Sequence, residues 1–368
     1  SVSGEGSDTI FENLVLQNGK AEGTFPDNAG GGMFIEESSP SILNCMFMGN
    51  VAGGGGGLYI YKNSAPTLTG CRFEGNSTSG DGGGLNCYMN CAPILSECPF
   101  FGNTAGFHGG GICFTETTYD LSGCDFENNS AVKYGGGIAL RDGSGVLSDC
   151  EFLTNQGAYG GAFGQYRLSD GVPPSDSSFI DCRFIENQTV GNDADGGGFY
   201  GSSDTIGLFE NCVFNANASQ GRGGGISIHT NATASFSGCT VRDNVAGTVG
   251  GGLVKTSSGE VTISDSTFCG NSPDDLVDVT DGGGNIVGTY LAGVLSNKFR
   301  QKNLLSLIYL GRAALIAWMM LMPKTEMTIF IFSGIFGLLW LSTVPLTSGV
   351  VAKIFCARHL GMLFGLVF

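Results

Sequence analysis

A short motif, Cys-x-Phe-x-x-Asn, recurs along the first three quarters of the chain and constrains the fold more than any other feature. It first appears with Cys45, Phe47 and Asn50, and successive Phe positions (Val in one repeat) lie 26 to 32 residues apart. A run of small residues, mostly glycines such as 55–57, follows nearly every Asn. Two signals that share one period predict a stack of equivalent structural units.

The residues of the motif are expected to form columns inside this stack. Cys and Phe are two positions apart, so on a strand they share one face, and the mostly polar residue between them faces outward. Each Asn is expected to hydrogen-bond to its counterpart one repeat later and to the turn backbone. The predicted column residues are Cys45, Cys71, Cys98, Cys124, Cys150, Cys182, Cys212 and Cys239, and Asn50, Asn76, Asn103, Asn129, Asn155, Asn187, Asn217, Asn244 and Asn271.

Each repeat contains three short strand-like segments and too little sequence between them for a crossover helix. Coiling the chain so that each strand pairs with its counterpart one repeat later satisfies the backbone hydrogen bonds, which predicts an all-β parallel β-helix of about nine or ten coils. The cysteine column is interpreted as apolar packing, because a uniform column offers neither disulfide pairing nor the spacing of a zinc site. Cys87 and Cys91 lie outside this register and are candidates for a bridge.

The repeats of residues 10–285 resemble those of right-handed β-helix surface proteins. The likeness rests on Phe-x-x-Asn after Cys, alternating with Gly-Gly-Gly or Gly-Gly-Ala before an apolar residue, and it is strongest to the repeats of polymorphic outer-membrane proteins. The resemblance implies a right-handed helix in an exported, surface-displayed adhesin or scaffold. Partners of such a protein would be glycans or cell-surface proteins.

The chain has two parts of opposite charge. Residues 1–285 hold 10 Lys and Arg against 32 Asp and Glu, a net charge of −22, whereas residues 286–368 hold 7 against 1, a net charge of +6. This shift predicts a domain boundary between 285 and 286. An acidic solenoid is not expected to bind nucleic acid, and it needs no cofactor, although its carboxylates can attract Ca²⁺.

The second part is predicted to be α-helical and to cross a membrane. Residues 304–322 carry one charge, Arg312, and residues 327–352 carry none. Each stretch meets the requirement of about 20 apolar residues for a bilayer span. We therefore expect two full transmembrane helices, with partial ones beside them.

Residues 286–368 resemble part of a major facilitator superfamily transporter. The loop 293–302 is similar to the Gly-x-Leu-[Ala/Ser]-[Asp/Asn]-[Arg/Lys] loop of that family, with Asn297 for the usual Asp and without the glycine after Phe299. The resemblance makes Arg312 a transport candidate, although a mid-span charge can equally pair with a neighbouring helix. Only ten residues, 286–295, separate the last coil from this loop, so we expect a fragment whose two parts meet at a short junction.

Two enlarged repeats offer candidate ligand-binding residues. The insertions 166–178 and 189–195 fall on neighbouring coils, with Arg167 and Arg183 nearby, and inserted solenoid loops often bind ligands on one face. Plain solvated turns are the alternative interpretation. The three histidines are interpreted as isolated, so no catalytic residue and no metal site is predicted. The candidate ligand-binding residues are Asp170, Asp176, Asp193 and Asp195.

Five Asn-x-Ser/Thr sequons occur in the repeats. Three of them, at Asn76, Asn187 and Asn217, use asparagines of the predicted ladder and are better explained by structure; the other two are at Asn128 and Asn231.

Together these features predict a non-enzymatic, surface-exposed β-helix protein of the adhesin or scaffold type, fused to an incomplete transporter-like membrane segment. Residues 1–285 would be extracellular and residues 286–368 integral to the membrane. One alternative is a carbohydrate-active β-helix enzyme, either a polysaccharide lyase or a glycosidase. The other is a transporter fragment in which the membrane segment is the working part.

Overall fold

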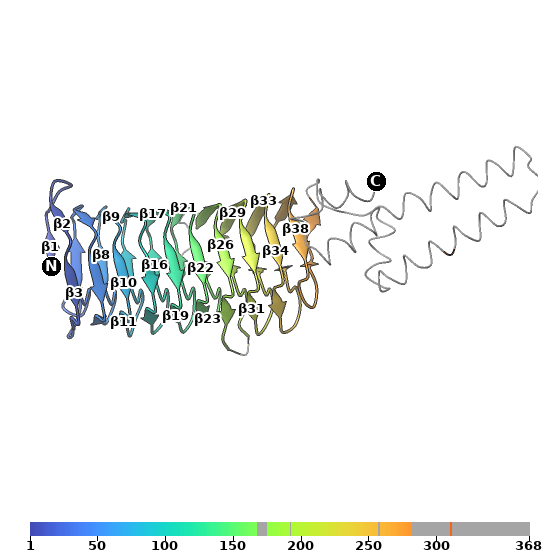
Figure 1. Cartoon of the computed structure of the whole chain (residues 1–368), viewed down its shortest axis with the longest axis horizontal. Coiled ribbons are helices and arrows are strands. Elements are labelled where there is room, and N and C mark those ends of the chain that lie inside the picture. The colour runs from blue at the N-terminus through green and yellow to red at the C-terminus, as the bar shows by residue number, and fades with distance from the viewer. Residues whose placement is uncertain (168–174, 192, 257, 282–309, 311–368) are drawn as a thin grey trace, which may run out of the picture. The chain divides into compact units, whose positions relative to one another are not determined.

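The computed structural model describes residues 1–167, 175–191, 193–256 and 258–281 together with Leu310. The chain divides into two compact units, Ser1–Gly283 and Gly284–Phe368. The first unit is a parallel β-solenoid, and Figure 1 shows its coils stacked one after another along a single axis. One of its sheets contains ten strands, one from each coil, so the predicted all-β parallel β-helix is confirmed.

The coils build four parallel sheets, which we name A, B, C and D in the order in which the chain visits them. The strands of sheet A are β1 (Val2–Ser3), β4 (Met33–Glu36), β8 (Leu58–Tyr61), β12 (Leu85–Tyr88), β16 (Ile112–Thr115), β20 (Ile138–Arg141), β24 (Phe163–Tyr166), β28 (Phe199–Gly201), β32 (Ile226–Ile228), β36 (Leu253–Lys255) and β39 (Leu276–Val277). The strands of sheet B are β2 (Ile10–Glu12), β5 (Ser41–Leu43), β9 (Thr67–Thr69), β13 (Ile94–Ser96), β17 (Thr118–Ser122), β21 (Ser144–Ser148), β25 (Asp176–Ile180), β29 (Ile206–Glu210), β33 (Thr233–Ser237), β37 (Val261–Ser264) and β40 (Thr280–Asp281).

Sheets C and D complete each coil. The strands of sheet C are β3 (Val15–Gln17), β6 (Met46–Met48), β10 (Arg72–Glu74), β14 (Phe100–Phe101), β18 (Asp125–Glu127), β22 (Glu151–Leu153), β26 (Arg183–Ile185), β30 (Val213–Asn215), β34 (Thr240–Arg242) and β38 (Thr267–Cys269). The two-residue strands of sheet D are β7 (Val51–Ala52), β11 (Ser77–Thr78), β15 (Thr104–Ala105), β19 (Ser130–Ala131), β23 (Gln156–Gly157), β27 (Gln188–Thr189), β31 (Ala218–Ser219) and β35 (Val245–Ala246). Sheet D is the short fourth side that the three-strand prediction lacked.

Corners between the sheets depend on residues with a left-handed backbone. The residue before each column Cys has positive φ, as at Asn44 (51°), and so has the residue before each ladder Asn, as at Gly102 (63°). The first glycine of the run, such as Gly55 (60°), supplies a third such corner. The second glycine is needed for a different reason, since a Cβ on Gly56 would collide with the carbonyl oxygen of Gly83 in the next coil. Glycine tolerates both situations at little cost.

The interior is filled by columns of identical side chains. On sheet C the rings from Phe47 to Phe214 stack with centroids 4.4 to 5.0 Å apart and planes within 10° of parallel. This spacing is that of neighbouring strands, ~4.8 Å, so the parallel register dictates the stack. Burial of each ring stabilises the fold by roughly 1.5–3 kcal/mol.

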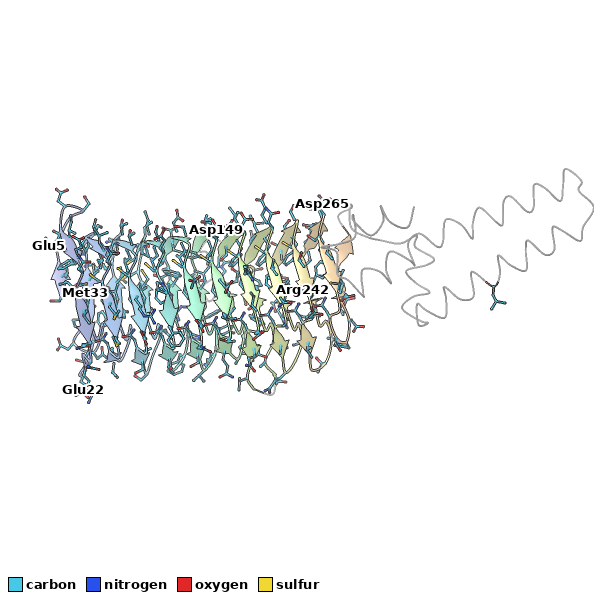
Figure 2. The ribbon with its side chains drawn as sticks, in the orientation of Figure 1. Glu5, Glu22, Met33, Asp149, Arg242 and Asp265 are labelled. Atoms are coloured by element: carbon cyan, nitrogen blue, oxygen red, sulfur yellow. The ribbon has the colours of Figure 1, made fainter. Side chains whose placement is uncertain are left out.

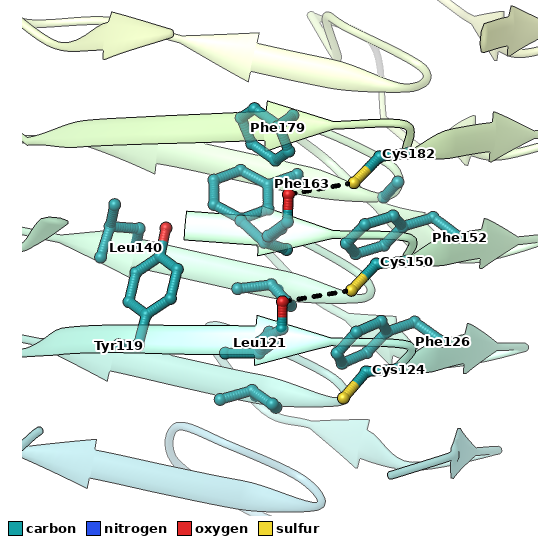
Figure 3. Packing of buried hydrophobic residues seen from close by; sticks show 14 of the residues in the cluster. Tyr119, Leu121, Cys124, Phe126, Leu140, Cys150, Phe152, Phe163, Phe179 and Cys182 are labelled. Atoms are coloured by element: carbon teal, nitrogen blue, oxygen red, sulfur yellow. Dashed lines mark hydrogen bonds between the residues drawn. The ribbon is translucent and has the colours of Figure 1, made fainter. Parts of the chain in front are cut away.

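A column of buried thiols lines the corner between sheets B and C. Figure 3 shows Cys124, Cys150 and Cys182 one above another beside the rings of Phe126 and Phe152. Each thiol contacts two carbonyl oxygens, one two residues back and one in the preceding coil; for Cys150 they lie at 3.3 and 3.9 Å. In the last coil a serine takes this place, and its hydroxyl donates to the carbonyl oxygen two residues back at 2.8 Å.

The asparagines form a continuous ladder at the corner between sheets C and D. The Nδ2 atom of Asn76 donates to Oδ1 of Asn103 and to the carbonyl oxygen of Phe47, both at 2.9 Å. The backbone N–H of Asn76 donates to the same Oδ1 at 3.0 Å. This pattern repeats to Asn271, where Oδ1 of Asp275 accepts both hydrogen bonds. Every amide of the ladder is therefore satisfied without solvent.

Charged side chains lie outside the coils. Figure 2 shows the labelled carboxylates of Glu5, Glu22, Asp149 and Asp265 at the outer surface of the solenoid, and all four residues are exposed. Their repulsion is spread over an elongated surface and screened by salt.

No helix among the described residues is long and apolar enough to cross a membrane. Apart from Leu310, the predicted spans 304–322 and 327–352, the loop 293–302 and Arg312 lie outside the residues that the structure describes.

Candidate binding site on the outer face of sheet A

The outer face of sheet A carries two groups of aromatic rings. Side chains alternate along each strand, so on β8 Leu58 and Ile60 fill the interior while Tyr59 and Tyr61 face outward. Residues of the preceding corner, where the chain passes from sheet D to sheet A, fold against this face. The outer face is therefore a second, smaller packing layer.

Near the N-terminal end this layer is an apolar cluster. Phe34 and Tyr59 stack with centroids 5.7 Å apart, and the ring of Phe25 lies 5.1 Å from that of Tyr61. The cluster is separate from the interior core, with Tyr88 at its edge. Phe25 itself is 49% exposed.

A row of four tyrosines, which we call the tyrosine row, continues along the same face. It consists of Tyr134, Tyr159, Tyr166 and Tyr200. Tyr134 stacks on Tyr166 at 4.0 Å and contacts Tyr159 at 5.1 Å, and Tyr159 reaches Tyr200 at 5.2 Å. Tyr134 and Tyr159 are half-buried and precede the small-residue runs of consecutive coils, whereas Tyr166 and Tyr200 lie beneath them on strands β24 and β28.

Burial favours the neutral form of three of these phenols, those of Tyr134, Tyr166 and Tyr200. It raises the pKa of Tyr134 and Tyr166, and it raises the pKa of Tyr200 to about 12. The hydroxyl groups of these three tyrosines therefore stay neutral throughout the physiological pH range.

At one end the row meets a hydrogen-bonded polar network. The Oδ2 atom of Asp195 lies 3.2 Å from Nε2 of His229 and 3.0 Å from a terminal nitrogen of Arg222. The backbone N–H of Arg222 also donates to Oδ1 of Asp195, at 2.6 Å. Nε2 of His229 lies 2.8 Å from Oγ of Ser227, and the His229 ring lies 5.1 Å from that of Tyr200.

Electrostatics hold Asp195 in the charged form. Burial of its carboxylate, which is only 3% exposed, raises its pKa, but hydrogen bonds from His229 and Arg222 and the charge of Arg222 outweigh this effect. The pKa of Asp195 is therefore lowered. The side chain of Arg222 is 44% exposed and turns part of its guanidinium toward solvent.

At the other end of the row lies a second polar cluster. The backbone N–H of His108 donates to Oδ1 of Asp81 at 3.2 Å, and the His108 ring lies 5.5 Å from that of Tyr166. Burial lowers the pKa of His108 and raises that of the nearby Cys113 thiol. Arg141 hydrogen-bonds to Tyr166. Histidine and thiol are thus both favoured in their neutral forms here.

The three predicted ligand residues that the structure describes do not all converge on one site. Asp195 belongs to the network beside the tyrosine row, and Asp193 is exposed in the same corner. Asp176 begins β25, where burial raises its pKa and its Oδ1 lacks a hydrogen-bond partner. Asp170 lies outside the described residues.

Residues 166–178 connect sheet A to sheet B and residues 189–195 connect sheet D to sheet A, so the two insertions start from opposite edges of sheet A. One expectation about this region was wrong. His229 is not isolated, because it contacts Asp195 and Ser227.

The two arginines near these insertions, Arg167 and Arg183, have different partners. Arg183 pairs with Glu151 on sheet C at 3.2 Å, away from both insertions, whereas Arg167 lies 3.8 Å from Asp204.

Sequence reasoning did not identify the tyrosine row, Arg222 or the pairing of His229. One signal was present, because Tyr134, Tyr159, Asp195 and Arg222 each directly precede a small-residue run and hence share one register. Isolated parallel β-bridges of the backbone join Tyr134 to Tyr159 and Tyr159 to Asp195.

Neither a metal site nor a disulfide is present in the described part of the chain. No group of three or more His, Cys, Asp or Glu side chains there could hold a metal ion. The twelve cysteines of the described ranges are free and buried, including Cys87 and Cys91.

The comparisons with known proteins agree with this architecture. A family model described as a right-handed β-helix region matches residues 2–159 and 100–299. Searches among curated proteins and among solved structures found no match. The two matched ranges together span most of the 368 residues. The chain therefore belongs to the right-handed β-helix family.

Proposed function

We propose that this β-helix is a non-enzymatic, surface-displayed binding protein that holds carbohydrate chains on the outer face of sheet A. The observation that carries the proposal is the tyrosine row, which continues through consecutive coils beside one exposed arginine, Arg222. Equivalent positions in successive coils are ~4.8 Å apart, so the face offers repeated contacts to a linear polymer.

The chemistry of this face suits sugars. The C–H faces of sugar rings pack on aromatic rings, and sugar hydroxyls find partners in neutral phenols, in Arg222 and in His229. Tyrosine presents a rigid aromatic surface and a polar tip with little loss of side-chain entropy. Tyr134 and Tyr159, the two half-buried members, would make the direct contacts.

Two features of the polar network favour binding over catalysis. In a Ser-His-Asp triad the imidazole uses one nitrogen for the serine and the other for the carboxylate. Here Nε2 of His229 contacts both Ser227 and Asp195, so the ring is not placed to relay a proton between them. Ser227 is fully buried, which leaves no approach for an electrophile.

A carbohydrate-active enzyme is the second candidate, and Asp195 is the observation that favours it. A buried carboxylate paired with a histidine and an arginine beside aromatic rings is a common setting for acid–base catalysis. An enzyme that uses Asp195 would release reducing ends or unsaturated products from a polysaccharide, and Asp195→Asn would abolish this release.

Display outside the cell is proposed from the resemblance of the repeats to those of surface proteins. Attachment to a membrane through residues 286–368 is proposed from their apolar sequence and their resemblance to a major facilitator segment. A transporter fragment remains the alternative for that segment. Antibody binding to intact cells tests the arrangement, because an antibody against residues 1–285 would bind from outside.

The binding proposal is tested with the full chain, purified in detergent, on a glycan array and then by calorimetry with the best ligand. We expect Tyr134→Ala and Tyr159→Ala each to weaken binding about tenfold or more, as for an aromatic contact worth about 1.4 kcal/mol or more. Phe101→Ala, which removes an aromatic ring from the outer face of sheet C, is the matched control and leaves binding unchanged.

Two results would overturn the proposal. One is an array without a specific ligand, and the other is equal binding by the tyrosine variants. Turnover of a bound polysaccharide would instead establish the enzyme.

A further inference from the structure

We propose that Asn128 and Asn231 are acceptor sites for N-linked glycans, and that the other three sequons of the solenoid are not. This inference rests on the proposed display outside the cell, because the transfer takes place in the secretory pathway. It concerns different residues from the tyrosine row.

The ladder excludes three of the five sequons. Asn76, Asn187 and Asn217 are fully buried, and Nδ2 of each uses both of its hydrogens inside the solenoid. One hydrogen bond goes to the next asparagine and the other to a phenylalanine carbonyl of the preceding coil; for Asn187 both lengths are 2.9 Å. A glycosylated Nδ2 keeps only one hydrogen, so these residues cannot both carry a glycan and complete the ladder.

Asn128 has the opposite setting. It is exposed at the corner between sheets C and D, with φ of 55°, while its neighbour Asn129 occupies the ladder. Its Nδ2 makes a long contact of 3.4 Å with the half-buried Glu127, and its Oδ1 accepts from Thr154 at 2.8 Å. A glycan on Nδ2 would leave the Thr154 hydrogen bond and the ladder intact.

Asn231 lies at the corner between sheets A and B. It is exposed in a turn with φ of 58°, and its Oδ1 accepts a hydrogen bond from Ser258. The sequon continues through Ala232 to Thr233, the first residue of β33. A glycan here would project from the edge of sheet A, two residues beyond His229.

The chemistry is a group transfer from a lipid diphosphate-linked oligosaccharide. A bond forms between Nδ2 and C1 of the first sugar, and the bond between C1 and the diphosphate oxygen breaks. The lipid diphosphate leaves with the electron pair, and the amide loses one proton. Asn128 and Asn231 are exposed, so the folded protein can carry a glycan on the Nδ2 atom of either residue.

The test uses the full chain, directed to the secretory pathway of a eukaryotic cell by an added cleavable leader. The folded fraction is selected by protease resistance, glycans are removed enzymatically in ¹⁸O-water, and the marked residues are identified by mass spectrometry. We expect marks at Asn128 and Asn231 and none at Asn76, Asn187 or Asn217. Ser130→Ala and Thr233→Ala, which destroy the sequons without changing the asparagines, each remove one mark.

Three outcomes would overturn the inference. The first is a mark on any ladder asparagine of the folded protein. The second is the absence of both expected marks while a co-expressed glycoprotein is modified, and the third, a mark at only one site, overturns the assignment of the other. Carbohydrate binding by the tyrosine row is measured on bacterially made, unglycosylated protein, so failure of one proposal is distinguishable from failure of the other.

Discussion

The carboxylate of Asp195 and the imidazole of His229 meet at 3.2 Å across two consecutive coils, although 189–195 and the segment after β32 belong to different corners of the solenoid. Asp195 precedes the glycines that lead into β28, whereas His229 follows the end of β32 one coil later. The ion pairs of Asp195 with His229 and Arg222 connect the corner between sheets D and A to the outer face of sheet A. We therefore expect them to stabilise the fold as well as to border the candidate site.

Replacing this carboxylate should reduce stability in a pH-dependent manner. Asp195→Asn leaves Arg222 and His229 without their anionic partner, and we expect a loss of about 1–3 kcal/mol at pH 7. Because the folded-state pKa of Asp195 is lowered, the charged form contributes stability above the unfolded-state pKa of about 3.9, and this contribution disappears as the pH falls through the folded-state value. Denaturant unfolding from pH 7 down to pH 3 measures the difference between the two proteins.

The control is Asp193→Asn, which changes an exposed carboxylate in the same corner and should leave stability unchanged at every pH. A stability difference for Asp195→Asn that stays constant between pH 7 and pH 3 would show that charge on this residue does not matter.

Much of the fold could be predicted because each interior column repeats one residue type. Identical side chains at a fixed period can meet only if the coils stack in register, so Phe47, Phe73 and the ladder asparagines together specify the solenoid. Sheet D was not predicted, because strands of two residues carry too little alternation to be recognised. The residue that ends the ladder was not predicted either. It is Asp275, an aspartate that lies four residues after Asn271 instead of one repeat later.

The candidate site was harder to predict because it is built from contacts between different columns. Asp195 was identified from its enlarged corner, but its partner His229, which also contacts Ser227, comes from another register position in the next coil. No repeat of one residue type marks that relationship. The tyrosine row is irregular for the same reason: Tyr134 and Tyr159 precede small-residue runs, whereas Tyr166 and Tyr200 lie on strands.

Interrupting the asparagine ladder should be far more harmful than changing the residue beside it. Asn129→Ala removes the acceptor of two hydrogen bonds from Asn103, its backbone N–H and its Nδ2. It also removes the donor to the carbonyl oxygen of Phe100. Since each buried group left unsatisfied costs about 1–3 kcal/mol, we expect a loss of about 3 kcal/mol or more in the free energy of unfolding.

Asn128→Gly is the matched control, because glycine accepts the left-handed backbone at the exposed neighbouring position. Thermal and denaturant unfolding of the two variants should differ clearly. If Asn129→Ala were as stable as Asn128→Gly, the ladder would not contribute to stability.

The corner before the ladder allows a stabilising substitution. Ala216 adopts φ of 56° at the position where Gly102 adopts 63°. A residue with a Cβ is strained by about 1–2 kcal/mol in this conformation. We expect Ala216→Gly to raise the free energy of unfolding by about 1 kcal/mol, and Gly102→Ala to lower it by a similar amount.

Gly102 is well suited to this comparison because a Cβ built on it would meet no atom within 4 Å, so only the backbone is strained. Calorimetric melting of Ala216→Gly and of Gly102→Ala measures the change in stability that each substitution causes. Shifts of the same sign would mean that backbone strain is not the dominant effect at this corner.

The buried thiols should resist alkylation until the solenoid opens. Cys45, Cys124 and the other cysteines of the described ranges are buried, so their thiols are inaccessible to a reagent in the folded state. Burial also raises the pKa of Cys113, so the thiolate form of that residue is scarce. Maleimide labelling of the native full chain, followed by peptide mapping, should be at least about 100-fold slower at these residues than in denaturant, because it requires local or global opening. Mapping by peptide separates Cys356, which lies outside the described residues. Rapid native labelling anywhere along the column from Cys45 to Cys239 would contradict an interior packed with thiols.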